Sequence, residues 1–204
     1  MSNCEVTGLP LLEVPLQHTK DALRCVLHTV LFNRALGVVK PRDVEVPGLG
    51  VVYAHCGDSK VHRKVEEQIG KFCAWAERHP GKVGQVILSF YERRFKQVWF
   101  SKQEEKLYWE QWQINLLIQD PRAPSVAGKT AEERKAMLHA AVQEALDTVL
   151  RAVNEKKEHI PPVVSSDIVT FPFDISISCA DDSSFGLDTI KNFLVQTAPP
   201  SMLN

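Results

Sequence analysis

The tripeptide Gly128-Lys129-Thr130, between an expected strand and an expected helix, is the part of this sequence closest to a phosphate-binding loop. Such a loop needs a glycine five residues before its second glycine, so that successive backbone amides can surround the phosphate oxygens. That position holds Ala123, and the following Pro124 has no amide hydrogen. We therefore interpret Gly128 as part of a loop and Thr130 as a helix cap. A nucleotide-using enzyme is the weakest of three function classes, and an ATP-binding test would decide it.

Cys25 and His28 would lie on one side of a helix, but a structural zinc site needs four ligands and no second Cys/His pair has metal spacing. A nucleophilic thiol needs a helix N-terminus or a neighbouring cation to lower its pKa, and a cysteine inside a helix has neither. The acidic pair Asp181-Asp182 lacks the further oxygen ligands that calcium requires. No G-x-S-x-G or H-E-x-x-H pattern occurs. We therefore expect no catalytic residue, no metal and no cofactor.

The adjacent residues Trp99 and Phe100 are the strongest sign of a binding site. Neighbouring side chains of an extended chain point to opposite faces, so a single core cannot easily accept both rings. The surrounding segment is polar and includes the basic residues Arg93, Arg94 and Lys96. Since tryptophan and arginine often carry interface energy, we expect an exposed contact element here. Two alternatives stay open: one ring packs back on the sheet, or both rings insert at a lipid interface while the three cations meet anionic headgroups.

Length, composition and charge describe one compact domain. The chain has 204 residues, of which 44% are hydrophobic and 24% charged, and its net charge is 24 − 25 = −1. It has no overall basic field for nucleic acid and no apolar run of the roughly 20 residues that a membrane span needs. Five widely spaced cysteines suit reduced thiols in the cytosol. We expect a single cytoplasmic domain over residues 1–204, with residues 197–204 as a flexible tail.

Apolar residues recur at helical spacing in three segments, which we expect to be the main helices: residues 19–36, 59–78 and 130–157. Thr19 and Ser59 are expected to cap the first two helices. Gly37 would end the first helix in a left-handed conformation. The third helix would begin with a capping box formed by Thr130 and Glu133.

Alternating hydrophobicity predicts the strands, which lie in residues 5–16, 44–46, 51–56, 85–94, 107–119 and 171–177. In the strand at 107–119, Trp112 would face the core and Gln111 would face water, while Tyr108 and Trp109 are also expected in the core. A short helix is expected at 186–196. The element order predicts an α+β fold, with a mostly antiparallel sheet packed against three main helices.

Five sequence blocks together resemble the family of autophagy-related protein 101, most closely its plant-type members. The blocks are residues 23–32, 89–92, 99–100, 108–112 and 153–157. They occur in order, and the likeness extends from Cys4 to Met202.

The resemblance implies a single HORMA domain without catalytic activity, which agrees with the expected order of elements. It also implies a subunit of the autophagy-initiation kinase complex, which pairs with and stabilises the HORMA domain of autophagy-related protein 13. Such a protein would act in the cytoplasm, at the phagophore assembly site. In that family an exposed Trp/Phe loop, the WF finger, recruits downstream autophagy factors. The role carries over to Trp99 and Phe100, with Arg93, Arg94 and Lys96 as flanking contacts, although animal members have a proline between the two aromatic residues.

Overall fold

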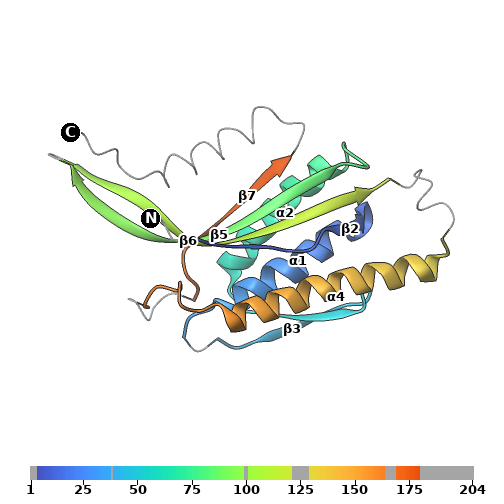
Figure 1. Cartoon of the computed structure of the whole chain (residues 1–204), viewed down its shortest axis with the longest axis horizontal. Helices are drawn as coiled ribbons and strands as arrows, with labels where there is room; N and C mark the ends of the chain where they lie inside the picture. Colours follow the sequence, from blue (N-terminus) through green and yellow to red (C-terminus); the bar gives the residue numbers. More distant parts are fainter. Residues whose placement is uncertain (1–3, 38, 99–100, 121–128, 164–168, 180–204) are drawn as a thin grey trace.

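The computed structural model describes residues 4–37, 39–98, 101–120, 129–163 and 169–179. Within these residues the elements are β1 (Glu5–Gly8), β2 (Leu12–Pro15), α1 (Leu16–Asn33), β3 (Arg42–Val46), β4 (Val51–His55), α2 (Ser59–Ala76), β5 (Val83–Val98), β6 (Ser101–Gln119), α4 (Ala131–Glu155) and β7 (Phe173–Cys179). The expected helix at 186–196 and the expected tail at 197–204 lie outside the described residues. Figure 1 shows the helices packed against the sheet, and one end of β5 and β6 projecting beyond them.

The main sheet has the strand order β1-β6-β5-β7, and β2 also pairs with β6. The long central strands β5 and β6 are antiparallel, as are β5 and β7, whereas β1 and β2 run parallel to β6. The strand expected in residues 5–16, with breaks at its prolines, forms two short strands, β1 and β2. They are separated near Pro10, because proline cannot donate a ladder hydrogen bond. A second sheet is the expected hairpin, β3 with β4.

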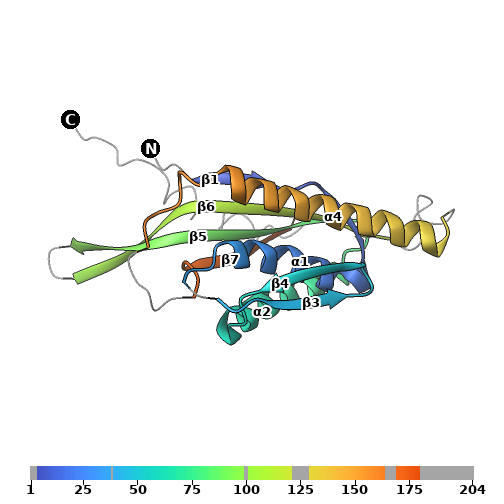
Figure 2. The same ribbon diagram turned by 90° about the horizontal axis from the view of Figure 1, so that it is seen from below.

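Helix α1 is the centre of the core. Its apolar residues at helical spacing, including Leu23, Leu27 and Leu31, are fully buried. It contacts β2 and β6 of the main sheet on one side, the β3–β4 hairpin on another, and both α2 and α4 (Figure 2). Most of the predicted apolar stripe of α4 is also buried, including Leu146 at 9% exposed, but Met137 and Leu150, which were predicted to belong to it, are 47% and 44% exposed. The α+β architecture with three helices and a mostly antiparallel sheet is confirmed for the described residues, and it is consistent with a single HORMA-like domain.

Two of the three predicted helix caps were wrong. Helix α1 begins at Leu16, and Thr19 lies inside its first turn, where the hydroxyl donates to the Pro15 carbonyl at 3.2 Å. Helix α2 is capped by Asp58 rather than Ser59, because the Asp58 carboxylate accepts from the backbone N–H groups of the second and third helical residues. The capping box that begins α4 is confirmed.

The end of α1 also differs from the prediction. Gly37 has the expected left-handed conformation, with φ of 69°, but the helix has already ended at Asn33. The chain leaves the helix early because Ala35 forms a bridge with Thr170 and the Leu36 N–H donates to the Val169 carbonyl at 2.7 Å. Tertiary contacts thus determine where this helix ends.

Candidate functional site: the β5–β6 hairpin

Strands β5 and β6 continue well past the sheet as a two-stranded ribbon. Pairing of β5 with β7 ends at Phe90↔Phe173, and pairing of β6 with β1 begins at Glu110↔Glu5. Beyond those pairs, residues 91–98 and 101–108 pair with one another in the described structure, and we call this segment the ribbon. It projects from one end of the molecule (Figures 1 and 2). The strands were predicted at 85–94 and 107–119, so the sequence underestimated both lengths.

Trp99 and Phe100, the residues predicted to form the contact element, lie outside the described residues. They connect Val98 at the end of β5 to Ser101 at the start of β6, which are the last paired residues of the ribbon. The structure therefore places their point of attachment at the far end of the ribbon. Their exposure and their role stay predictions.

The basic residues before the aromatic pair are partly neutralised within the ribbon. The Arg93 side chain lies 3.3 Å from a carboxylate oxygen of Glu104, and Arg94 lies 3.4 Å from Glu92. Lys96 belongs to β5, but its side chain is outside the described part of the structure. Arg93 and Arg94 are 57% and 62% exposed, so they remain accessible to a partner.

Phe95 is a candidate contact residue that the sequence interpretation missed. Its side chain is 67% exposed, and it pairs in register with Glu104 on β6. A large aromatic residue this exposed, on a ribbon that projects from the body, is typical of an interaction surface. The signal for Phe95 was that it lies two and four residues after Arg93 and Tyr91, on the same face of an extended chain. A predicted strand that continued past residue 94 would have included it.

A β-bulge lies at the base of the ribbon. Phe90 pairs with Glu110 while Tyr91 pairs with Tyr108, so Trp109 is the additional residue of β6. Residues 109–112 are all buried, whereas a strand with one face toward a core usually buries alternate residues. The core positions predicted for Trp109 and Trp112 are confirmed. Tyr108 is half-buried rather than in the core, and Gln111 is 7% exposed rather than facing water.

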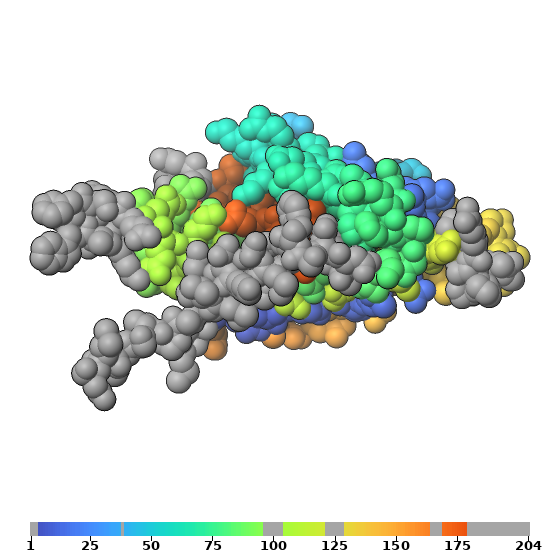
Figure 3. Space-filling view, turned by 90° about the horizontal axis from the view of Figure 1, so that it is seen from above, coloured from blue at the N-terminus to red at the C-terminus, as the bar shows by residue number. Residues whose placement is uncertain are grey.

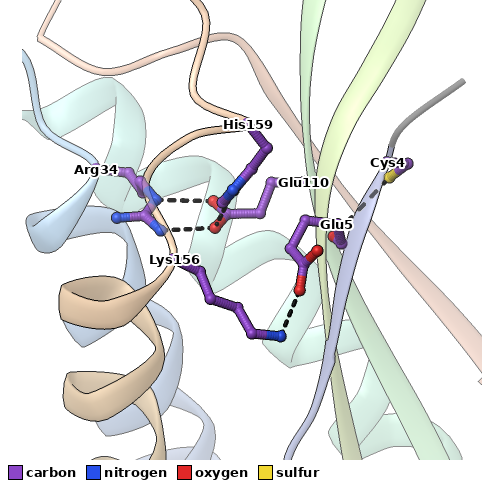
Figure 4. Close-up of polar contacts among 6 residues, drawn as sticks. All are labelled: Cys4, Glu5, Arg34, Glu110, Lys156 and His159. Atoms are coloured by element: carbon purple, nitrogen blue, oxygen red, sulfur yellow. Dashed lines mark hydrogen bonds and ion pairs between the residues drawn. The ribbon is translucent and has the colours of Figure 1, made fainter.

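A buried polar cluster is centred on Glu110 at this same base (Figure 4). The Arg34 guanidinium donates two hydrogen bonds to the Glu110 carboxylate, at 2.8 and 2.7 Å, and the two side chains are 4% and 1% exposed. His159 Nε2 lies 3.1 Å from the same carboxylate and donates to it, because a carboxylate can only accept. Lys156 pairs with Glu5 beside this cluster. The cluster joins the end of α1, the middle of β6 and the segment after α4.

Several contacts within the described residues bear on the catalytic and metal hypotheses. Burial raises the pKa of the Cys25 thiol to about 12, the opposite of what a nucleophile needs. His28 packs against His55 and His62, with ring centroids 5.5 Å away in both cases. No group of His, Cys, Asp and Glu in the described part of the chain could hold a metal ion. Lys129 Nζ lies 3.2 Å from the Met137 sulfur. The rest of the candidate loop, residues 121–128, and the pair Asp181-Asp182 lie outside the described residues.

No helix of the described structure is long and apolar enough to cross a membrane.

Fold and hairpin together define a HORMA-like α+β domain with a projecting two-stranded ribbon. The sequence model of the family described as autophagy-related protein 101 matches residues 12–167. Autophagy-related protein 101 of Arabidopsis thaliana is 41% identical over 216 residues, covering 98% of this chain and 99% of that protein. The proteins of the same name from Schizosaccharomyces pombe and Homo sapiens are 26% and 23% identical, covering 80% and 79% of this chain and 82% and 77% of those proteins. The chain belongs to the autophagy-related protein 101 family, and the higher identity to the Arabidopsis protein fits a plant-type member. Its role is therefore in autophagy.

Proposed function

We propose that this chain is a non-catalytic adaptor subunit of the autophagy-initiation kinase complex. It binds and stabilises the HORMA domain of autophagy-related protein 13, and it recruits downstream autophagy factors through Trp99 and Phe100. It does this in the cytoplasm, at the phagophore assembly site. The whole chain, residues 1–204, acts as one HORMA domain in this proposal.

The projecting ribbon is the observation that carries the proposal. A two-stranded hairpin without a packed layer buries little apolar surface, so its length does not serve the stability of the core. It does hold Val98 and Ser101, the residues on either side of the aromatic pair, away from the body. Phe95 and the exposed arginines extend this accessible surface toward the sheet. An aromatic pair at the end of such a ribbon suits a recruiting element.

Charge on the ribbon favours a protein partner over a lipid surface. Residues 91–108 carry five basic and three acidic side chains, for a net charge of +2. Of these, Arg93 and Arg94 already contact carboxylates of the ribbon. Stable attachment to anionic lipid usually takes a denser basic cluster. Membrane insertion is therefore an outcome to be tested rather than a second proposal.

The test replaces both aromatic residues, Trp99→Ala and Phe100→Ala, in the full chain. Substitutions of exposed side chains usually change stability by no more than about 0.5 kcal/mol, whereas loss of an interface tryptophan costs about 2 kcal/mol, roughly a thirtyfold loss of affinity. We expect an unchanged melting temperature, retained binding to the partner HORMA domain, and failure to restore autophagic flux in cells lacking the protein. Val52→Ala is the matched control, since Val52 is 60% exposed on the separate β3–β4 hairpin. Full complementation by the double variant contradicts the finger assignment, and unfolding indicates buried rings.

Two further measurements separate the other parts of the proposal. Light scattering of the chain mixed with the HORMA domain of autophagy-related protein 13 is expected to show a one-to-one heterodimer. A stable homodimer that excludes this partner would contradict it. Flotation with liposomes containing anionic lipid is expected to show no binding that depends on Trp99 and Phe100, and such binding would favour the membrane alternative.

A further inference from the structure

Asp174 on β7 connects the ribbon to the body of the protein. Its Oδ2 atom lies 2.6 Å from Lys106 Nζ and accepts a hydrogen bond from the Tyr108 hydroxyl at 3.2 Å. Lys106 and Tyr108 are both ribbon residues of β6 and, two positions apart on a strand, point to the same side. The other carboxylate oxygen, Oδ1, lies 3.4 Å from Lys64 Nζ of α2. One side chain thus joins the ribbon, β7 and α2.

These contacts cross an intervening strand. Asp174 pairs in register with Ser89 of β5, so its side chain reaches over β5 to contact β6. Tyr91 of β5 lies beneath this crossing, with its ring 4.5 Å from Lys106 Nζ and 5.5 Å from the Tyr108 ring. Lys64 is held in turn by the Phe173 carbonyl and by the Phe173 ring, 4.4 Å from its Nζ. In Figure 3 the orange-red surface of β7 lies between the surface of α2 and the green surface of β5 and β6.

The electrostatics of Asp174 match a carboxylate held in place by cations. Burial alone would raise the pKa of Asp174, but Lys106, Lys64 and the Tyr108 hydroxyl together hold it below its ordinary value. The group is therefore ionised at neutral pH. Its side chain is 33% exposed, so the ion pairs are only partly shielded from water and contribute modestly to global stability. Their arrangement at a junction suggests a different use.

Because the ribbon projects from the body, the direction in which it leaves the sheet determines where its far end lies. Tyr108 and Ser101 are seven positions apart on β6, which is about 23 Å of extended chain at about 3.3 Å per residue. A swing of about 20° at the base would move the far end by about 8 Å. The β-bulge at Trp109 interrupts the regular ladder of hydrogen bonds at the base of the ribbon. The backbone hydrogen bonds therefore restrain the direction of the ribbon less at its base than elsewhere along it.

We propose that Asp174 is a positioning residue, which fixes the direction of the β5–β6 ribbon and so the place where Trp99 and Phe100 are presented. The inference rests on the proposed function of those two residues. When the carboxylate is lost, the ribbon samples a wider range of directions. If the binding-competent fraction falls tenfold, the apparent affinity of a partner that must engage both the ribbon and the body falls tenfold as well.

The first experiment measures the direction of the ribbon itself. Phe95 and Val52, both largely exposed, are replaced by non-natural residues that carry spin labels. Double electron–electron resonance then measures the distance from the ribbon to the body in the full chain. Phe95 lies four pairs from the base of the ribbon, about 13 Å away, so a swing of about 20° at the base would move it by about 4 Å. Asp174→Asn is therefore expected to widen the distance distribution by about that amount. Tyr108→Phe removes one hydroxyl and keeps the ring, and it is expected to widen the distribution less. Glu67→Gln, which removes a carboxylate paired with Lys71 on α2, is the control and should leave the distribution unchanged.

The second experiment tests the consequence in cells. Asp174→Asn is expected to keep its melting temperature within a few degrees and its affinity for the HORMA domain of autophagy-related protein 13, yet to restore autophagic flux poorly. A distance distribution as narrow as that of the unmodified chain, in both Asp174→Asn and Tyr108→Phe, overturns the inference. So does a widened distribution with full restoration of flux. Failure of the proposed function is a different result, in which the Trp99→Ala and Phe100→Ala variant restores flux. Should Asp174→Asn fail to fold, Tyr108→Phe alone decides the question.

Discussion

The buried pair of Arg34 and Glu110 allows a quantitative test of what holds the base of the ribbon. Both side chains are almost fully buried, at 4% and 1% exposed, and they share two short hydrogen bonds. Glu110→Gln keeps the size of the side chain but removes its charge, which leaves the Arg34 guanidinium buried without a counter-ion. Breaking such a pair from one side costs about 3–5 kcal/mol, a large part of the roughly 5–15 kcal/mol that stabilises a typical domain.

This loss is large enough to be measured in two ways. For a chain of this length a change of 1 kcal/mol shifts the melting temperature by about 2–4 °C, so Glu110→Gln is expected to lower it by about 6–20 °C. Urea unfolding followed by tryptophan fluorescence gives the free energy of unfolding directly, since Trp109 packs beside this cluster with its ring 5.8 Å from that of His159. Glu67→Gln, at an exposed pair, is the control and is expected to show no measurable change.

A double-mutant cycle identifies the cause of the loss. Arg34→Met combined with Glu110→Leu removes both charges, and paired replacement by apolar residues is often tolerated. The double variant is therefore expected to lose clearly less stability than the sum of the two single variants, with a coupling of about 2 kcal/mol or more. Additive losses, or a loss below about 1 kcal/mol for Glu110→Gln, would refute the reasoning that an uncompensated buried charge determines the cost.

Three further substitutions test the core. The pKa of buried His28 is lowered to about 4 by burial and by its histidine neighbours, so between the ordinary value of 6.5 and 4 the unfolded chain binds more protons than the folded one. The free energy of unfolding should therefore fall by up to about 3 kcal/mol as the pH falls through this range, and urea titrations of His28→Gln should show a flatter decline. A Cβ atom on Gly84 would lie 2.5 Å from Trp75, so Gly84→Ala should lower the melting temperature, at a cost of about 1–3 kcal/mol, while Gly70→Ala in open space should not; equal effects would contradict this packing. Leu146→Asp places an unpaired carboxylate in the core and should cost several kcal/mol in a thermal melt, and an unchanged melting temperature would show that the α4 stripe is assigned wrongly.

Features that depend on neighbours in the chain were predictable from the sequence. Apolar spacing predicted all three helices, and the capping box of Thr130 and Glu133 predicted the start of α4 within one residue. The hairpin of β3 and β4 and the central strands followed from alternation and turn residues. These signals are local, since backbone hydrogen bonding and side-chain period are set within a few residues. The aromatic pair was also noticed from sequence alone, and its role stays a prediction.

Contacts between residues far apart in the chain were decided by the tertiary structure. Arg34 and Glu110 are 76 positions apart, and Lys106 and Asp174 are 68 apart, so no periodicity could pair them. The length of the ribbon was likewise hidden, because the bulge at Trp109 shifts the alternation that identifies a strand. An isolated charged residue in a sequence is usually solvated, and only folding determines which carboxylate meets which cation. Sequence therefore determined the elements, whereas the tertiary structure decided how the ribbon is attached and held, because chain folding alone brings those charges within hydrogen-bonding distance.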